Sequence, residues 1–284
     1  MKNSGVLLVQ CPDQKGLDAA IAQFLYERNG NILHFEQHVA GTEGFYLARI
    51  EWCLDGFQID IADFTEAFTP VAIRFGMQWR VVKGSHRPRV AIFVSKYDHC
   101  LVDLLYRQRN GELACDIPLI ISNHPDAKRH ADFYGIQYEV IPVSKENKPE
   151  AEKQEIQLLR KSEIDLIVLA RYMQVLSSDF IRHYLQQIIN IHHSFLPAFI
   201  GAKPHQQAYD RGVKLIGATA HYVTEVLDDG PIIEQGVARI SHRDALEDLV
   251  EKGRDLEKVV LSRAVRWHIE NRILLYDNKT VIFE

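Results

Sequence analysis

Short apolar runs alternate with helical patterns along the chain, and the order of these elements changes near residue 84. In the N-terminal part, the two periodicities predict strand, helix, strand, strand, helix and strand, with a hairpin turn at residues 41–44. These elements are expected over residues 6–11, 17–28, 32–40, 45–53, 57–75 and 77–82. Residues 1–84 therefore predict a small α+β domain in which two helices accompany one sheet.

Residues 85–89, Ser-His-Arg-Pro-Arg, are polar and broken by a proline, as linkers between domains are. Beyond them, short continuous apolar runs again alternate with helical patterns. The expected strands cover 90–94, 117–122, 138–143, 164–170, 188–191 and 217–224, and the expected helices cover 100–109, 127–134 and 148–161. This alternation predicts an α/β domain over residues 90–284 with a mostly parallel, helix-covered sheet. Polar sites of such domains form at the carboxyl ends of the strands.

Composition narrows the function classes. The 284 residues are 46% hydrophobic and 25% charged, with a formal net charge of -5, which is typical of a globular protein of two domains. No Lys/Arg-rich stretch is present to neutralise phosphates, so we expect no nucleic-acid partner. No apolar run approaches the ~18 residues that a membrane span needs, and the four cysteines show no C-x-x-C spacing. We therefore expect a cytoplasmic protein with no membrane partner.

Motifs that bind nucleotides and metals are missing from the sequence. The chain has neither G-x-x-x-x-G-K-[ST] nor G-x-G-x-x-G, and it has no H-E-x-x-H or Cys/His cluster with zinc spacing. The serine elbow G-x-S-x-G is absent too. We expect no metal and no permanently bound cofactor.

Asn190 and His192 stand at the end of an apolar strand. Because side chains alternate along a strand, both point to the same side, and an amide donor converges with a titratable imidazole. The alternative is that Asn190 ends the strand as a turn former and that His192 and His193 lie on a surface loop. The two histidines are a poor metal pair, because adjacent residues of an extended chain point to opposite faces.

Asp228 lies in the segment Leu-Asp-Asp-Gly-Pro, residues 227–231, between two expected strands. Hairpin chemistry alone accounts for such a segment. The segment also places a carboxylate next to the edge of a sheet, where it could orient an imidazole or raise its basicity.

Over residues 88–284 the chain resembles the folate-dependent formyltransferase domain. The resemblance rests on the motifs Asn190-x-His192, Ser194-x-Leu-Pro197, Gly201-Ala-x-Pro204, Thr219-x-His221 and Asp228 in L-D-x-G-P. It implies a Rossmann-like domain in which Asn190, His192 and Asp228 are catalytic. Within that group, residues 170–177 resemble formyltetrahydrofolate deformylases almost residue for residue, and residues 95–101 lack the glycines of the transferases' phosphate-binding loop.

The deformylase resemblance implies a hydrolase. Its substrate would be 10-formyltetrahydrofolate and its products tetrahydrofolate and formate, which would supply formate for purine synthesis and balance the one-carbon folate pool. Two alternatives stay open: transfer of the formyl group to an amine, and folate binding or amino-acid sensing without catalysis.

Hydrolysis of a formamide requires that water is activated and that the developing oxyanion is stabilised. Asn190 would donate to the oxyanion, His192 would stabilise the same oxygen and protonate N10, and Asp228 would hold the imidazole and the water. Whether Asp228 or His192 accepts the proton stays open, because such a pair titrates together. Four neighbours could line the site or simply be packed or solvated: Arg171, Lys203, His205 and His221.

By the same resemblance, the pterin lies against two segments, Met173-Gln174-Val175-Leu176 and Val223-Thr224-Glu225. Apolar walls with main-chain hydrogen-bonding groups are usual for small-molecule pockets. Met173 and Leu176 could instead be core residues. Gln174 stands where the transferases have an arginine, and the preferred folate polyglutamate length stays open.

The βαββαβ order of residues 5–83, with Cys11-Pro12-Asp13 leading into Gly16, resembles the ACT domain. This ferredoxin-like regulatory module often binds an amino acid between paired copies. The resemblance implies an effector site at Asp13, Gly16, Gly30 and Asn31 across a subunit interface, and hence a homo-oligomer, either a dimer or a tetramer. It neither names the effector nor says whether it activates or inhibits. The alternative is an α+β module that serves dimerisation only.

Overall fold

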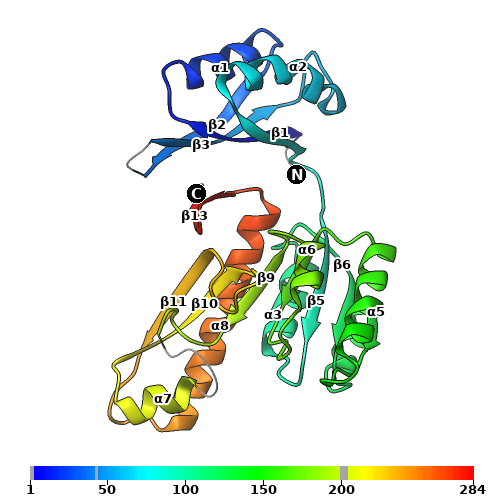
Figure 1. Cartoon of the computed structure of the whole chain (residues 1–284), viewed down its shortest axis with the longest axis vertical. Helices are drawn as coiled ribbons and strands as arrows, with labels where there is room; N and C mark the ends of the chain where they lie inside the picture. The colour runs from blue at the N-terminus through cyan, green and yellow to red at the C-terminus, as the bar shows by residue number, and fades with distance from the viewer. Residues whose placement is uncertain (1–2, 42–43, 199–203) are drawn as a thin grey trace. The chain divides into compact units, whose positions relative to one another are not determined.

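The computed structural model describes residues 3–41, 44–198 and 204–284, and the chain divides into two compact units (Figure 1). The first unit consists of Met1–His86 and Glu270–Glu284, and the second unit consists of Arg87–Ile269. The predicted division differs at the C-terminus, because it placed all of residues 90–284 in one domain. Both ends of the chain therefore belong to the first unit.

The first unit is built on an antiparallel sheet of order β2-β3-β1-β4, and its predicted order of strands and helices is confirmed. Its elements are β1 (Ser4–Pro12), α1 (Leu17–Tyr26), β2 (Asn31–Ala40), β3 (Phe45–Cys53), α2 (Ile61–Phe75) and β4 (Gln78–Lys83). The C-terminal segment adds a hairpin of β12 (Ile273–Tyr276) and β13 (Lys279–Ile282).

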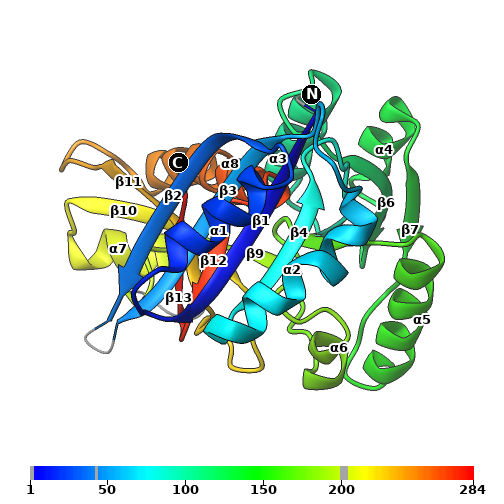
Figure 2. The same ribbon diagram turned by 90° about the horizontal axis from the view of Figure 1, so that it is seen from above.

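One face of this sheet is covered by α1 and α2 (Figure 2). Aromatic rings fill the space between them: Trp52 stacks on Phe64 with ring centroids 5.2 Å apart, and Phe24 meets Phe68 edge-on at 5.0 Å. Because a buried aromatic side chain removes about 150–250 Å² from water, this layer supplies much of the hydrophobic stabilisation of the first unit.

The helix α2 begins later than the predicted range of 57–75. Asp60 is its N-cap, with extended backbone angles of φ -71° and ψ 153°. Phe57 lies before the helix and packs on Trp52 with ring centroids 5.6 Å apart. The apolar spacing at Phe57 therefore reflects contact with the core rather than helical structure.

The opposite face of the same sheet is covered by the hairpin β12–β13 (Figure 1). Leu8 and Leu47 of the sheet are buried together with Leu274 of the hairpin. Phe45 stacks on Tyr276 with ring centroids 5.0 Å apart. The last residues of the chain thus complete the packing of the first unit.

The second unit contains a seven-stranded sheet of order β11-β10-β9-β8-β5-β6-β7. Its strands are β5 (Arg89–Val94), β6 (Asp116–Ser122), β7 (Gln137–Val140), β8 (Leu166–Leu169), β9 (Ile188–His192), β10 (Leu215–Tyr222) and β11 (Ile232–Arg239). The first five run parallel, whereas β10 pairs antiparallel with β9, and β11 pairs antiparallel with β10 at the edge of the sheet. The predicted mostly parallel sheet is confirmed. The strand predicted over 138–143 ends at Val140, because Pro142 cannot donate to a ladder.

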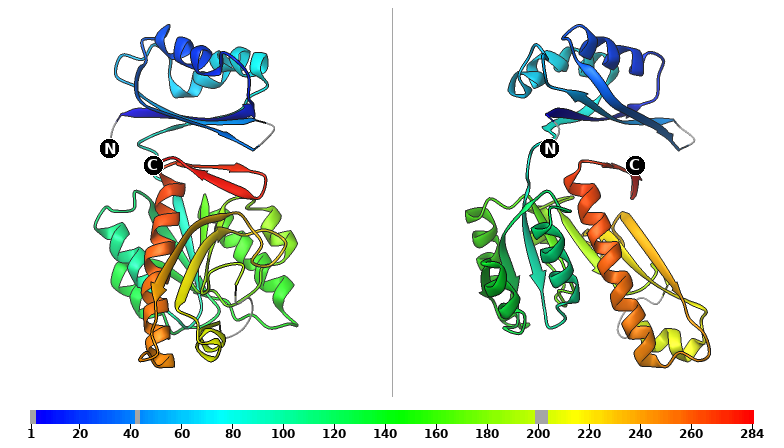
Figure 3. Two further views of the ribbon diagram at one scale, coloured as in Figure 1. Left: turned by 90° about the vertical axis from the view of Figure 1, so that its left-hand side faces the viewer. Right: turned by 180° about the vertical axis from the view of Figure 1, so that it is seen from behind.

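Helices cover both faces of this sheet (Figure 3). They are α3 (His99–Arg109), α4 (Lys128–Tyr134), α5 (Lys148–Lys161), α6 (Ser178–Arg182), α7 (Pro204–Arg211) and α8 (Leu246–Ile269). On one face, Phe93 and Leu169 of the sheet are buried against Leu159 of α5 and Phe180 of α6. The long helix α8 packs on β9, β10, β11 and α3. None of the helices in the described ranges is long and apolar enough to cross a membrane.

Candidate active site

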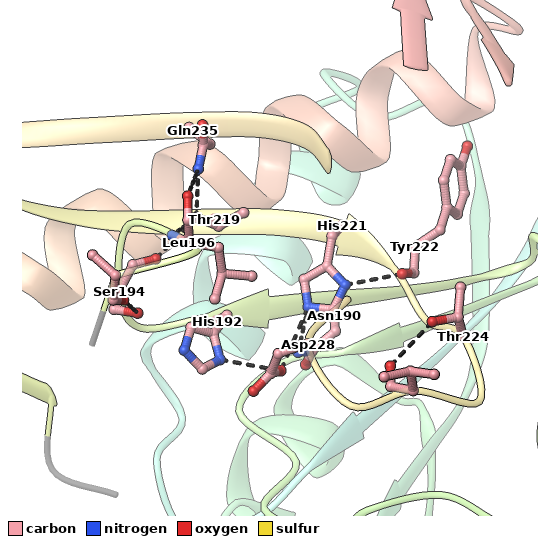
Figure 4. Close-up of polar contacts among 12 residues, drawn as sticks. Asn190, His192, Ser194, Leu196, Thr219, His221, Tyr222, Thr224, Asp228 and Gln235 are labelled. Atoms are coloured by element: carbon pink, nitrogen blue, oxygen red, sulfur yellow. Dashed lines mark hydrogen bonds and ion pairs between the residues drawn. The ribbon is translucent and has the colours of Figure 1, made fainter. Parts of the chain in front are cut away.

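The candidate site begins where β9 and β10 lie side by side. Their antiparallel pairing sets His221 opposite Asn190 and Thr219 opposite His192 (Figure 4). Asn190 and His192 are two positions apart on β9, and the structure brings both to the same cavity. The alternative of a surface loop is wrong for His192, which is only 6% exposed.

Asp228 reaches this point through the loop between β10 and β11. The loop closes tightly, since Tyr222 N donates to the Pro231 carbonyl oxygen over 2.9 Å. Only glycine fits at position 230, where a Cβ would lie 1.7 Å from the Tyr222 carbonyl oxygen. Asp228 itself adopts a left-handed backbone with φ 56°, an unusual conformation for a residue with a side chain. The tight loop therefore sets the carboxylate beside β9.

The Asp228 carboxylate oxygen Oδ1 lies 3.2 Å from His192 Nδ1. The hydrogen bond from His192 lowers the pKa of Asp228, so this group is a carboxylate at neutral pH. Because the carboxylate can only accept, Nδ1 carries a hydrogen, and in the neutral form of the ring the lone pair is on Nε2. His192 Nε2 is buried and has no hydrogen-bond partner within the described part of the chain. A nitrogen of this kind is available to a bound substrate.

His221 is the neighbour that sequence reasoning could not place. Its Nδ1 lies 2.9 Å from the Tyr222 carbonyl oxygen, which can only accept, so Nδ1 carries the hydrogen. Burial lowers the pKa of His221 and keeps the ring neutral. Its Nε2 then accepts from Asn190 Nδ2 over 3.2 Å and lies 3.8 Å from Asp228 Oδ1. His221 thus fixes the orientation of the Asn190 amide.

The chain beyond His192 is held by a buried hydroxyl. Thr219 Oγ1 donates to the Ser194 carbonyl oxygen over 2.9 Å and accepts from Leu196 N over 3.0 Å. Gln235 Nε2 also donates to Thr219 Oγ1, over 3.1 Å (Figure 4). This network fixes the segment that follows the imidazole. The Thr219-x-His221 motif therefore supports the site from the neighbouring strand.

A first cavity of about 410 Å³ opens over these groups. All ten residues predicted as catalytic or substrate-binding line it: Met173, Gln174, Val175, Leu176, Asn190, His192, Val223, Thr224, Glu225 and Asp228. Met173 and Val175 are more than half exposed, so Met173 is not a core residue, whereas Leu176 is buried. The structure thus gathers three distant segments of the sequence, 173–176, 190–192 and 223–228, around one cavity.

The other candidates fall in different places. Arg171 lines the first cavity together with His221, and His205 lines a neighbouring second cavity. Gly201 and Lys203 lie outside the described residues. The predicted effector residues Asp13 and Gly16 precede α1, whereas Gly30 and Asn31 follow it, so one chain holds them at opposite ends of a ten-residue helix. A single chain does not bring the four together.

Among the described residues, one group has the spacing of metal ligands: His99, Cys100 and Glu257, with ligand atoms within 4.8 Å of one another. Burial raises the pKa of Cys100 well above its usual range and keeps the thiol protonated. Arg171 Nε lies 3.5 Å from Glu257 Oε2, so a guanidinium already faces this carboxylate. A neutral thiol beside a guanidinium is a poor ligand set for a cation.

Comparison with known proteins identifies the family of the chain. The sequence model of the Formyl transferase family matches residues 88–265, and that of the ACT domain matches residues 5–70. The chain is 54% identical to the formyltetrahydrofolate deformylase of Synechocystis sp. over 280 residues, covering 99% of this chain and 98% of the relative. The chain belongs to the formyltetrahydrofolate deformylase family.

Other members of the deformylase family agree over the full length. The formyltetrahydrofolate deformylase of Bacillus subtilis is 46% identical over 284 residues, covering 99% of this chain and 94% of its own. A solved structure of a formyltetrahydrofolate deformylase from Pseudomonas syringae pv. tomato superposes with a TM-score of 0.98 at 46% identity, covering 100% of this chain and 95% of that one. The predicted fold, an ACT domain followed by a formyltransferase domain with a mostly parallel sheet, is confirmed.

Proposed function

We propose that Asn190, His192 and Asp228 carry out the deformylase reaction in this chain, in which 10-formyltetrahydrofolate and water give tetrahydrofolate and formate. The observation that carries the proposal is the buried Nε2 of His192, which has no hydrogen-bond partner among the described residues, whereas the other ring nitrogen lies 3.2 Å from the Asp228 carboxylate. A carboxylate–imidazole pair with one free nitrogen is suited to general acid–base catalysis.

His192 is the base in this scheme. Its lone pair on Nε2 takes a proton from water as the oxygen attacks the formyl carbon, and Asp228 stabilises the imidazolium that forms. The lowered pKa of Asp228 makes its carboxylate a weak proton acceptor and a good counter-charge. The geometry therefore favours His192 over Asp228 as the proton acceptor.

Asn190 holds the oxyanion. One amide hydrogen of Asn190 is used by His221 Nε2, and the second is free to donate to the formyl oxygen as negative charge develops there. The His192 imidazolium then returns its proton to N10 as the carbon–nitrogen bond breaks. The products are tetrahydrofolate with a neutral N10–H and formic acid, which loses its proton to solvent and becomes formate. No covalent intermediate is needed.

The folate lies in the first cavity. Its apolar lining, including Val175, Leu176 and Val223, suits the flat pterin, while main-chain groups supply directional hydrogen bonds. The segment 173–176 and the segment 223–225 supply these contacts. Gln174 takes the place of the transferases' arginine in that wall.

Water is favoured over a ribonucleotide acceptor by the loop that leads into α3. Asp98, at the N-cap of that helix, accepts hydrogen bonds from His130 over 2.8 Å and from Arg129 over 3.2 Å. A carboxylate at a helix N-terminus repels phosphate and takes the place that phosphate prefers.

The deciding experiment is single-turnover and steady-state assay of 10-formyltetrahydrofolate in H₂¹⁸O with no amine present. We expect tetrahydrofolate and formate in equal amounts, with one ¹⁸O in each formate. His192→Ala should abolish turnover, and His242→Ala, at an exposed position, should not. Turnover that appears only after an amine is added would replace the hydrolase with a transferase.

The remaining expectations extend this proposal. The enzyme acts in the cytoplasm as a homo-oligomer with no permanently bound cofactor, supplies formate for purine synthesis and balances the folate pool. An amino acid bound at Asp13, Gly16, Gly30 and Asn31 regulates it, and the two halves of that site come from different subunits. Calorimetry on the full chain with the twenty amino acids tests this, since Glu270–Glu284 belongs to the same unit as the effector residues.

A further inference from the structure

A second cavity of about 460 Å³ adjoins the first one within the second unit. The two cavities share three lining residues, Arg171, Met173 and His193. His193 follows His192 directly, and the two rings lie with their centroids 5.2 Å apart. A molecule that leaves the reacting groups therefore enters the second cavity as soon as it has passed these three shared residues.

The second cavity is built on one face of α8. Leu246, Val250, Arg254 and Glu257 line it at intervals of three or four residues, the spacing that puts side chains on one side of a helix. On the same face, a Cβ at Gly253 would lie 2.0 Å from His205 Nε2. Glycine at 253 lets the His205 ring pack directly on the helix and form part of the wall.

The charges of the second cavity favour an anion. Arg171 and Arg254 lie over the ring of Tyr97, with their guanidinium carbons 5.4 and 5.6 Å from its centroid. Arg171 Nε lies 3.5 Å from Glu257 Oε2, but within the described ranges Arg171 Nη1 is buried without a hydrogen-bond partner, and no carboxylate forms an ion pair with Arg254. Among the described residues, Glu257 is the one carboxylate that lines the cavity, and it is also bonded to His99 over 2.8 Å.

The histidines of the wall do not change this balance. Burial and the nearby Arg171 lower the pKa of His193 to about 3, and burial also lowers the pKa of His205. Both rings are neutral near pH 7. Two guanidinium groups then face one carboxylate, so the lining carries a net positive charge.

We propose that the second cavity binds the carboxylate product, formate, after it is released at His192, with Arg171 and Arg254 as its ligands. The inference rests on the proposed function, which supplies the formate. Tetrahydrofolate still fills the first cavity when the carbon–nitrogen bond has broken, and that blocks the way back. A planar guanidinium matches a carboxylate with two parallel hydrogen bonds, and burial strengthens this attraction.

The test is direct binding of ¹³C-formate to the resting protein, measured by NMR line broadening with and without saturating tetrahydrofolate. We expect formate to bind in both conditions, because tetrahydrofolate fills only the first cavity. Arg254→Gln should weaken binding about tenfold, as expected for loss of one charge-assisted hydrogen bond. Arg254→Lys should recover part of the affinity. Arg266→Gln removes the same charge from α8 outside the cavity and should bind like the unchanged protein.

Three results would overturn the inference: no formate binding, binding that tetrahydrofolate abolishes, or equal affinity in Arg254→Gln and the unchanged protein. Competition by chloride as strong as by acetate would also overturn it, because it would show a general anion site without carboxylate recognition. Formate binding does not require turnover. A protein that binds formate as expected but releases none from 10-formyltetrahydrofolate would refute the proposed function and keep the anion cavity.

Discussion

The two cavities share part of their lining, and each contains a carboxylate–imidazole pair, but the carboxylate contacts a different ring nitrogen in each. In the first, Asp228 lies beside Nδ1 of His192, and Nε2 has no partner in the part of the chain that the structure describes. In the second, Glu257 takes Nε2 of His99, over 2.8 Å. Asp228 stands on a tight loop with a left-handed backbone, whereas Glu257 is in the middle of a long helix.

This difference separates a reacting pair from a structural one. A buried nitrogen without a hydrogen bond destabilises the folded state by about 1–3 kcal/mol, so it is retained where a ligand completes it. In the first cavity the unpaired atom is the imidazole nitrogen that we propose as the base. In the second cavity it is a guanidinium nitrogen, which attracts anions but transfers no proton at neutral pH.

The largest expected effect comes from breaking the reacting pair. Asp228→Asn replaces the acceptor beside His192 Nδ1 with an amide, and we expect kcat to fall by about 10⁴ because the imidazole loses its orientation and its counter-charge. KM should change little. Asp229→Asn is the matched control, since this neighbouring carboxylate does not line the first cavity. Steady-state kinetics on both variants check the prediction, and a loss of less than tenfold in Asp228→Asn contradicts it.

The next effect tests the oxyanion donor. Asn190→Ala removes the amide hydrogen that faces the developing charge, and we expect kcat to fall by about 10²–10³. The substitution should leave folate binding intact, which equilibrium titration with tetrahydrofolate measures separately. A rise in KM at unchanged kcat would show instead that Asn190 serves ground-state binding.

His221 should have a smaller effect, because its hydrogen bond in the site is to the Asn190 amide, whose orientation it fixes. His221→Leu removes the acceptor for Asn190 Nδ2, and we expect kcat to fall about tenfold as the amide loses its fixed orientation. His221→Gln keeps an acceptor in reach and should recover part of the rate. Equal rates in the two variants would assign His221 to packing alone.

The smallest effect concerns His193, which lines both cavities, and it is measured as a change in the free energy of unfolding. Its pKa is lowered from 6.5 to about 3, so the unfolded chain takes up a proton below pH 6.5 and the folded protein does not. The stabilisation is present in full above pH 6.5 and is lost as the pH falls toward 3. Relative to His193→Asn, the unchanged protein should lose roughly 1 kcal/mol per pH unit between pH 6 and 4. Urea unfolding measures this, and curves that stay parallel contradict it.

The sequence predicts most of the two folds because their patterns are local. The period of two along β9 predicts that Asn190 and His192 share a side, and the structure places both at one cavity. Pairing of β10 with β9 brings Asp228 to the same point, and single-residue patterns do not encode that pairing. The family motif supplied Asp228 where periodicity could not.

Other features depend on contacts between distant residues. Periodicity did not predict that the C-terminal hairpin packs on the first unit. Strands as short as β12 show no clear periodicity, and their position is determined by contacts with distant residues, such as that of Phe45 with Tyr276. The role of His221 was open for the same reason. The donor and acceptor roles of its two ring nitrogens follow from the contacts with Asn190 and with the Tyr222 carbonyl oxygen. Only the pairing of the strands brings these groups close to the ring.

The position of the C-terminal hairpin has a consequence for synthesis of the protein. The sheet of the first unit is made first, yet the strands that cover its second face, β12 and β13, are the last to be made. At about 5–20 residues per second, the ribosome needs on the order of tens of seconds to make the second unit in between. During that time Leu8 and Leu47 have no cover from their own chain. Until translation ends, this apolar face of the nascent N-terminal sheet stays exposed, and exposed apolar surface favours aggregation.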